Sequence, residues 1–269
     1  MKTRIISGAV FVVVVAIVFF LTPAIVTTIV VALMSALASY ELLYTTGLVK
    51  NLRLNVYSAV MAVLVTMVSQ YAAYSIFFCV ILLYWMLLFS EVLLSSGKIP
   101  VAEIGYCLMS GLIIPLLLSA LVRIRGGQNS NAVMFIPFIM AFFSDTGAYF
   151  IGVFFGKHKM CPNISPKKSW EGFVGGITVA MLGMVVYCLI VDNLFGYRVN
   201  YVLAVIYGLV GSIGSVVGDL TMSVIKRQTG IKDYGKLIPG HGGILDRFDS
   251  VIITAPLTEA LMILIPMVV

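Results

Sequence analysis

The sequence predicts an all-α fold: a polytopic integral membrane protein with about nine transmembrane helices and a cytoplasmic N-terminus. Apolar residues make up 61% of the 269 positions and charged residues only 10%, against roughly half and about a quarter in ordinary soluble domains. The apolar residues also form blocks of about 18 to 25, the length of helix that crosses a hydrocarbon core about 30 Å thick. We interpret these blocks as bilayer spans.

Nine blocks have the required length. In chain order they are Ile5–Leu21, Ala24–Leu43, Leu54–Tyr71, Ala73–Leu94, Tyr106–Leu121, Ala132–Phe155, Phe173–Phe195, Tyr201–Ile225 and Ile244–Val269. The first block follows two basic residues, as the apolar part of a signal peptide would. No small-residue cleavage site follows it, so we expect it to be retained.

The basic residues predict the orientation, because positively charged loops near span ends remain in the cytoplasm. With a cytoplasmic N-terminus, 14 of the 17 Lys and Arg residues fall on the cytoplasmic side. Only Arg123, Arg125 and Arg198 fall outside. This asymmetry favours an odd number of spans and an external C-terminus.

The net charge of +6 does not indicate a nucleic-acid partner, because the basic residues are spread over loops without aromatic interleaving or a recognition motif. Insertion topology and attraction to anionic membrane lipids explain them better. Four cysteines lack CxxC spacing and are typical of apolar filler: Cys79, Cys107, Cys161 and Cys188.

The chain divides into a scaffold, residues 1–125, and a catalytic transmembrane region, residues 126–269. The second region holds two long loops rich in Lys, Gly and Pro, Gly156–Gly172 and Arg227–Gly243. Because long loops in compact proteins usually carry function, we expect the site there.

Two carboxylates lie inside predicted spans of this region. Asp145 interrupts the sixth span and Asp219 the eighth. A carboxylate at this depth costs a few kcal/mol, about 2.5–3.5 on insertion scales, and normally faces a polar cavity, a cation or a partner. An interhelical hydrogen bond is the alternative for each. The eighth span places Asp219, Ser223 and Arg227 four residues apart on one helical face. This face extends about 12 Å from the buried acid to the cytoplasmic loop.

The last predicted span opens with two more acids, Asp246 and Asp249, whose spacing of three places them on one helical face. A helix N-terminus favours acids in any case. Several acids beside lysine-rich loops nevertheless indicate a hard cation such as Mg²⁺ together with bound phosphate. This combination is typical of phosphoryl or nucleotidyl transfer.

The stretch SVIKRQTGIKDYGKLIPGHGGILDRFD, residues 223–249, resembles the signature of the phosphatidate cytidylyltransferase (CDP-diacylglycerol synthase) family. The segments SDTGAYFIGVFFGKHK, residues 144–159, and ISPKKSWEGFVGG, residues 164–176, are also similar to family segments. The resemblance implies that CTP and phosphatidate give CDP-diacylglycerol and pyrophosphate, with Mg²⁺ required. We expect a bacterial cytoplasmic membrane, with the active site facing the cytoplasm, where the distribution of basic residues places these loops.

The family match and the placement of the acids together suggest roles for individual residues. Asp219, Asp246 and Asp249 would hold one or two divalent cations, with a monovalent cation also compatible, and Asp145 would extend the cluster or contact the nucleotide. Phosphate binding and catalysis would involve the remaining candidates, which are Lys167, Lys168, Ser223, Lys226, Arg227, Lys232, Lys236, His241 and Arg247. His241 has an alternative role as an ordinary turn residue.

Two other functions remain open. A CTP-dependent kinase of a polyprenol or another lipid alcohol would share part of the acid and glycine arrangement but transfer the γ-phosphoryl group. A transporter would also use intramembrane carboxylates, with acids near the midplane and inverted repeats. The small-residue faces permit a homodimer. Glu41, Glu91 and Glu259 fit either the cavity or interhelical bonds.

Overall fold

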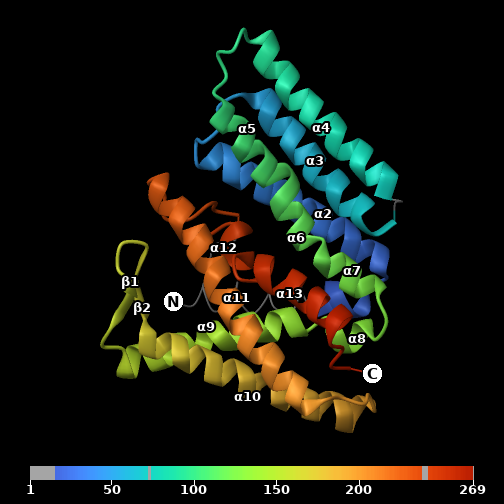
Figure 1. Cartoon of the computed structure of the whole chain (residues 1–269), viewed down its shortest axis with the longest axis vertical. Helices are drawn as coiled ribbons and strands as arrows, with labels where there is room; N and C mark the ends of the chain where they lie inside the picture. Colours follow the sequence, from blue (N-terminus) through green and yellow to red (C-terminus); the bar gives the residue numbers. More distant parts are fainter. Residues whose placement is uncertain (1–15, 72–73, 238–241, 269) are drawn as a thin grey trace. The chain divides into compact units, whose positions relative to one another are not determined.

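The computed structural model describes residues 16–71, 74–237 and 242–268 (Figure 1). Most of these residues are helical, and one two-stranded hairpin and several connecting loops make up the rest. Seven helical stretches within the described ranges are long and apolar enough to cross a membrane: Ala24–Thr45, Leu52–Gln70, Tyr74–Leu94, Val101–Gly126, Ser130–Phe155, Trp170–Phe195 and Tyr201–Gln228. The protein is therefore an α-helical, multi-pass integral membrane protein, as predicted.

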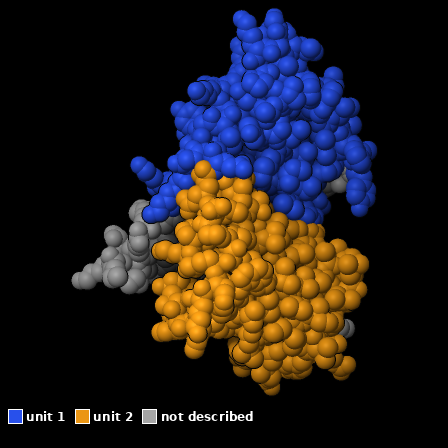
Figure 2. Space-filling view, turned by 60° about the vertical axis from the view of Figure 1, so that its left-hand side comes forward, with its two compact units in different colours: residues 1–126, 228–247 blue, residues 127–227, 248–269 orange. Residues whose placement is uncertain are grey.

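The chain forms two compact units, coloured separately in Figure 2. Unit 1 consists of residues 1–126 and 228–247, and unit 2 of residues 127–227 and 248–269. The segment 228–247, which carries much of the family-like signature, thus packs with the N-terminal helices. The functional division at residue 125 stays a prediction, because compactness alone does not locate catalysis.

Unit 1 is built around an apolar core that includes Leu43, Leu54, Tyr84, Leu88 and Ile104. Two of its membrane helices contain π-helical turns, η2 and η3. Its elements are η1 (Ile17–Leu21), α2 (Ala24–Tyr40), η2 (Glu41–Thr45), α3 (Leu52–Tyr71), α4 (Tyr74–Leu94), α5 (Val101–Leu108), η3 (Met109–Ile113), α6 (Ile114–Leu118), α7 (Ala120–Gly126) and most of α12 (Leu245–Phe248).

Unit 2 contains two long helices packed side by side, α9 (Ile136–Phe155) and α10 (Trp170–Phe195) (Figure 1). Glycines of α10 permit the close approach: a Cβ at Gly172 or Gly176 would come within 2.7 Å of a backbone carbonyl oxygen of α9. The other elements are α8 (Ser130–Val133), β1 (Lys159–Cys161), β2 (Ser165–Ser169), α11 (Tyr201–Gln228) and α13 (Val251–Leu264).

The first long loop of the catalytic region folds as the antiparallel hairpin β1–β2, a feature the sequence interpretation did not include. Glu171, in the first turn of α10, accepts the backbone N–H groups of Lys157 and His158. Ser169 Oγ accepts the Gly172 N–H at 3.2 Å and so caps α10. These bonds tie both ends of the hairpin to one helix terminus.

Seven of the nine predicted spans correspond to the long helices, with boundaries shifted by a few residues. The first span, Ile5–Leu21, lies mostly outside the described residues. The ninth, Ile244–Val269, is wrong as a continuous helix, because α12 ends at Phe248 and α13 begins only at Val251. Asp249 Oδ1 accepts the Ser250 N–H at 2.8 Å within the intervening turn. Asp246 and Asp249 therefore do not share one uninterrupted helix.

Candidate active site

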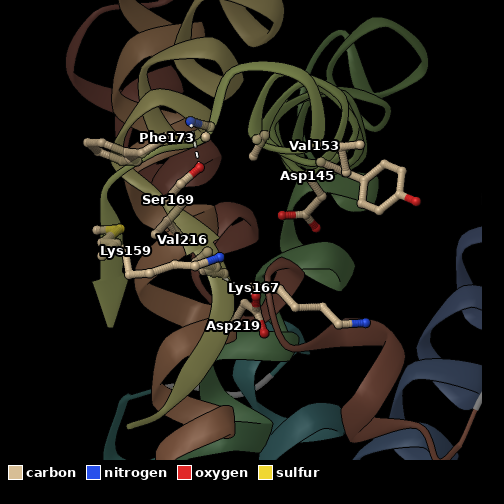
Figure 3. A pocket seen from close by; sticks show the side chains of 15 residues that line it. Asp145, Val153, Lys159, Lys167, Ser169, Phe173, Val216 and Asp219 are labelled. Atoms are coloured by element: carbon tan, nitrogen blue, oxygen red, sulfur yellow. Dashed lines mark hydrogen bonds and ion pairs between the residues drawn. The ribbon is translucent and has the colours of Figure 1, made fainter. Parts of the chain in front are cut away.

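A pocket of about 610 Å³ opens within unit 2, inside the range of about 300–1,000 Å³ usual for small-molecule sites (Figure 3). The helices α9, α10 and α11 and the hairpin all contribute to it. Its charged lining residues are Asp145, Lys159, Lys167, Lys168 and Asp219. Its apolar lining includes Ala148, Tyr149, Val153, Met160, Phe173 and Val216.

Asp145 enters the pocket from the middle of α9 (Figure 3). Its Oδ1 accepts from Ser215 Oγ at 3.4 Å, and its Oδ2 accepts from Ser250 Oγ at 3.3 Å. Both bonds are long for hydroxyl donors, whose preferred distance is about 2.7–2.8 Å. Asp145 is therefore held loosely, by side chains that can rotate away.

Asp219 enters the same pocket from α11 and forms an ion pair with the hairpin. Lys168 Nζ lies 2.6 Å from Asp219 Oδ2, and Ser223 Oγ donates to Asp219 Oδ1 at 3.3 Å. The predicted shared face of Asp219 and Ser223 is thus confirmed. The side chains of Lys168 and Asp219 are 21% and 27% exposed, so the pair is partly sheltered but reachable from the pocket.

Asp249 reaches this region because of a glycine on α11. A Cβ at Gly218 would collide with the Asp249 carbonyl oxygen, so only glycine permits the turn after α12 to lie so close to α11. The Asp249 carboxylate is repelled by Asp219 and Asp145 and attracted by Lys226. Asp145 is likewise repelled by Asp219 and attracted by Lys168. Three acids within electrostatic reach of one another favour bound positive charge.

The basic residues around the pocket differ in how they are used. Lys167 and Lys159 are exposed and line the pocket. Arg227, at the end of α11, donates from Nε to the Ile164 carbonyl oxygen at 3.1 Å and so fastens the hairpin tip to α11. Arg227 thus has at least one structural contact in addition to its predicted role with phosphate.

Four of the remaining predicted residues belong to unit 1: Asp246, Arg247, Lys232 and Lys236. Their predicted roles in the site remain predictions. Asp246 Oδ2 accepts the backbone N–H groups of Tyr234 and Gly243 at 2.7 and 3.0 Å. His241 lies outside the described residues.

The donor atoms of unit 2 suit a hard cation, because the acids and serines present only oxygen ligands. Among residues 16–71, 74–237 and 242–268, no three His, Cys, Asp or Glu side chains are grouped as a ready metal site. Mg²⁺ is usually held by one or two carboxylates, with water and substrate phosphates completing its octahedron. The described residues fit a cation held in this manner.

Sequence reasoning missed one residue that lines the pocket and two that donate hydrogen bonds to Asp145. Lys159 was absent from the predicted set, although it lies in a quoted segment beside the lysine-rich loop. Ser215 and Ser250 were not assigned to Asp145, because their contacts join positions 70 and 105 residues away from it. The packing of α11 and of the turn before α13 against α9 brings these residues together.

Comparison with known proteins shows which family this chain belongs to. Residues 2–265 match the cytidylyltransferase family. The phosphatidate cytidylyltransferase of Staphylococcus saprophyticus is 36% identical over 177 residues, which cover 66% of this chain and 66% of that protein. The enzymes of the same name from Staphylococcus epidermidis and Staphylococcus aureus are 37% and 36% identical over 174 residues, 65% of each chain. The matched segment thus spans just under two thirds of these relatives. Since the family match covers almost the whole chain, the protein belongs to the cytidylyltransferase family.

Proposed function

We propose that this protein transfers the cytidylyl group of CTP to phosphatidate, giving CDP-diacylglycerol and pyrophosphate in phospholipid biosynthesis. The observation that carries the proposal is one pocket in a membrane protein with acids and lysines beside an apolar wall of Tyr149, Val153 and Phe173. A charged phosphate on a lipid needs both kinds of surface. Family membership and the names of the bacterial relatives support the same reaction.

In this reaction a phosphate oxygen of phosphatidate forms a bond to the α-phosphorus of CTP. The bond from that phosphorus to the oxygen bridging to the β-phosphorus breaks, and pyrophosphate leaves with the electron pair. A phosphomonoester dianion is already nucleophilic, so the site needs no strong general base. Its main tasks are to align the two phosphates and to offset their negative charge.

The lysines of the hairpin perform the second task. Lys167 is exposed beside the pocket, and Lys168 is held toward it by Asp219. Lys226 and Arg227 at the end of α11 extend the positive charge, as a helix C-terminus favours. Ser223 orients Asp219 through their hydrogen bond.

Mg²⁺ is the cofactor we propose, held by Asp219 and Asp249, with Asp246 as a further ligand and Asp145 near the nucleotide. Bound Mg²⁺ supplies Lewis-acid stabilisation of the charge on phosphate oxygens. Lys168 now neutralises Asp219. A cation held at Asp219 would offset the charge of that carboxylate, and the Lys168 ammonium would then be available to a phosphate oxygen.

The test uses purified protein in lipid vesicles with phosphatidate, Mg²⁺ and CTP labelled in turn at the α- and γ-phosphates. We expect α-label in the lipid and γ-label in pyrophosphate, with loss of transfer in EDTA and recovery on adding Mg²⁺. γ-Label in the lipid would indicate a CTP-dependent lipid kinase. Label in neither lipid product would contradict transferase function and favour a transporter.

For localisation we propose the bacterial cytoplasmic membrane, with the hairpin and pocket on the cytoplasmic side. The Staphylococcus relatives and the distribution of Lys and Arg support this. Cys161 in β1 is a natural probe. A membrane-impermeant maleimide should label it in inside-out vesicles and not in right-side-out vesicles, with Cys161→Ser as the control. Labelling only from the outside would reverse the orientation.

A further inference from the structure

A buried acid in unit 1 contacts the family-like signature directly. Glu41 begins the π-helical turn η2 and is only 4% exposed. Its Oε1 accepts the backbone N–H of Ile244, and its Oε2 accepts that of Leu245, each at 2.9 Å. These two amides immediately precede Asp246. The carboxylate therefore fixes the backbone just before an acid that the sequence assigns to the active site.

Two glycines leave room for this contact. A Cβ at Gly243 would collide with both carboxylate oxygens of Glu41, and one at Gly235 would come within 2.7 Å of Oε1. The signature segment therefore approaches the Glu41 carboxylate at two positions that carry no side chain, Gly235 and Gly243. Any side chain at either position would push the carboxylate and the two amides apart.

The contact adjoins further hydrogen bonds between η2 and the signature segment. Thr45, at the other end of η2, donates from Oγ1 to the Tyr234 carbonyl oxygen. The Tyr234 N–H donates to Asp246 Oδ2 at 2.7 Å, and the Gly243 N–H donates to the same oxygen at 3.0 Å. The turn η2 thus contacts the signature loop at Tyr234 and at Ile244 and Leu245, and two amides of the loop donate to one oxygen of Asp246.

We propose that Glu41 is a positioning residue that orients Asp246 for cytidylyl transfer by anchoring the Ile244 and Leu245 amides. The inference rests on the proposed function, since it assumes that Asp246 acts in that reaction. Another buried acid of unit 1 has different partners: Glu91 accepts the Tyr57 hydroxyl and pairs with Arg53. Glu91, which is 8% exposed and lies in α4, is therefore a matched control.

The experiment compares wild type, Glu41→Gln and Glu91→Gln in lipid vesicles. Hydrogen–deuterium exchange is measured first without divalent cations, on peptides covering residues 234–249. Gln presents an NH₂ group to one of the two amide donors, so Glu41→Gln should accelerate exchange at residues 244 and 245, whereas Glu91→Gln should not. In transfer assays Glu41→Gln should lower kcat by about 10-fold or more, the effect of losing a hydrogen bond to a charged group. KM for CTP should change by less than about 2-fold, because the proposed role of Glu41 concerns turnover and not the binding of CTP.

A second variant keeps the test valid if Glu41→Gln fails to fold. Gly243→Ala forces a Cβ against the Glu41 carboxylate and should cause the same faster exchange and lower kcat. Full protection and normal kcat in Gly243→Ala, rapid exchange of both amides in wild type, or equal behaviour of the two Gln variants would each overturn the proposal. Failure of the proposed function is distinguishable, because wild type would then transfer no cytidylyl group while the exchange measurement still reports on the anchor.

Discussion

Two acids of unit 1 and two acids of unit 2 are held in opposite ways. In unit 1, Glu41 and Asp246 accept backbone N–H groups at 2.7 to 3.0 Å. In unit 2, Asp145 accepts hydroxyl groups at 3.3 and 3.4 Å, and Asp219 accepts one hydroxyl and pairs with Lys168. Backbone donors cannot leave without refolding the loop, whereas side-chain donors can rotate. The first pair is suited to organise the chain, and the second to exchange partners with a ligand.

The largest effect is expected at the acid whose partners can exchange. Asp219→Asn should lower kcat by about 10² or more, the usual loss when one preorganised electrostatic group is removed, with the helical content unchanged. Asp192→Asn is the control, because Asp192 accepts a hydrogen bond from Tyr201 and does not line the pocket. Steady-state transfer assays and circular dichroism check both variants. Near wild-type kcat in Asp219→Asn would remove Asp219 from the reaction.

Asp246→Asn separates the charge of this acid from its role in holding the loop. Its side-chain carbonyl can still accept the Tyr234 and Gly243 amides, so the loop should keep its structure. Turnover should nevertheless fall by about 10² or more if the lost charge serves the reaction. Exchange of residues 234–249 and kcat are measured on the same preparation. Normal turnover with an intact loop would make Asp246 an organising acid only.

Lysine replacements should have a smaller effect that appears mainly in binding. Lys167→Ala should raise KM for CTP or phosphatidate by about 10-fold, as for loss of one hydrogen bond to a charged group. Lys159→Ala should do the same, because Lys159 also lines the pocket, whereas Lys157→Ala should not, because Lys157 does not line it. Substrate titrations separate the three. A normal KM for both substrates in either pocket variant would exclude that lysine.

The smallest change concerns stability. Gly218→Ala places a Cβ against the Asp249 carbonyl oxygen and should cost about 1–3 kcal/mol, as overpacking usually does. Gly105→Ala is the control, since a Cβ there meets nothing within 4 Å and Ala favours a helix. Thermal unfolding in detergent measures both. An unchanged melting temperature in Gly218→Ala would show that the turn can move away from α11.

The sequence predicted the parts of this molecule that depend on composition and spacing. Membrane spans follow from long apolar blocks, and the pairing of Asp219 with Ser223 follows from the helical repeat of about 3.6 residues. Asp145 and Asp219 were each recognisable as acids at membrane depth. These features depend on nearby residues or on average polarity, which the linear sequence contains.

Contacts between distant segments were not predictable in the same way. The bond from Glu41 to Ile244 joins residues 203 positions apart, and neither residue type indicates the other. The hairpin was also missed, because its segments contain Lys, Ser and Pro rather than the usual strand formers. The ninth span was predicted as one helix because its apolar residues give no sign of the break at Asp249 and Ser250, where the chain contacts α11.

The break before α13 also bears on how the protein meets its lipid environment. A helix of 14 residues is about 21 Å long, well short of a hydrocarbon core of about 30 Å. Such hydrophobic mismatch is relieved by local thinning of the bilayer or by polar residues entering it. The turn at Asp249 and Ser250 adjoins the short helix. We therefore expect bilayers of different thickness to change the rate of the proposed reaction at constant substrate concentration.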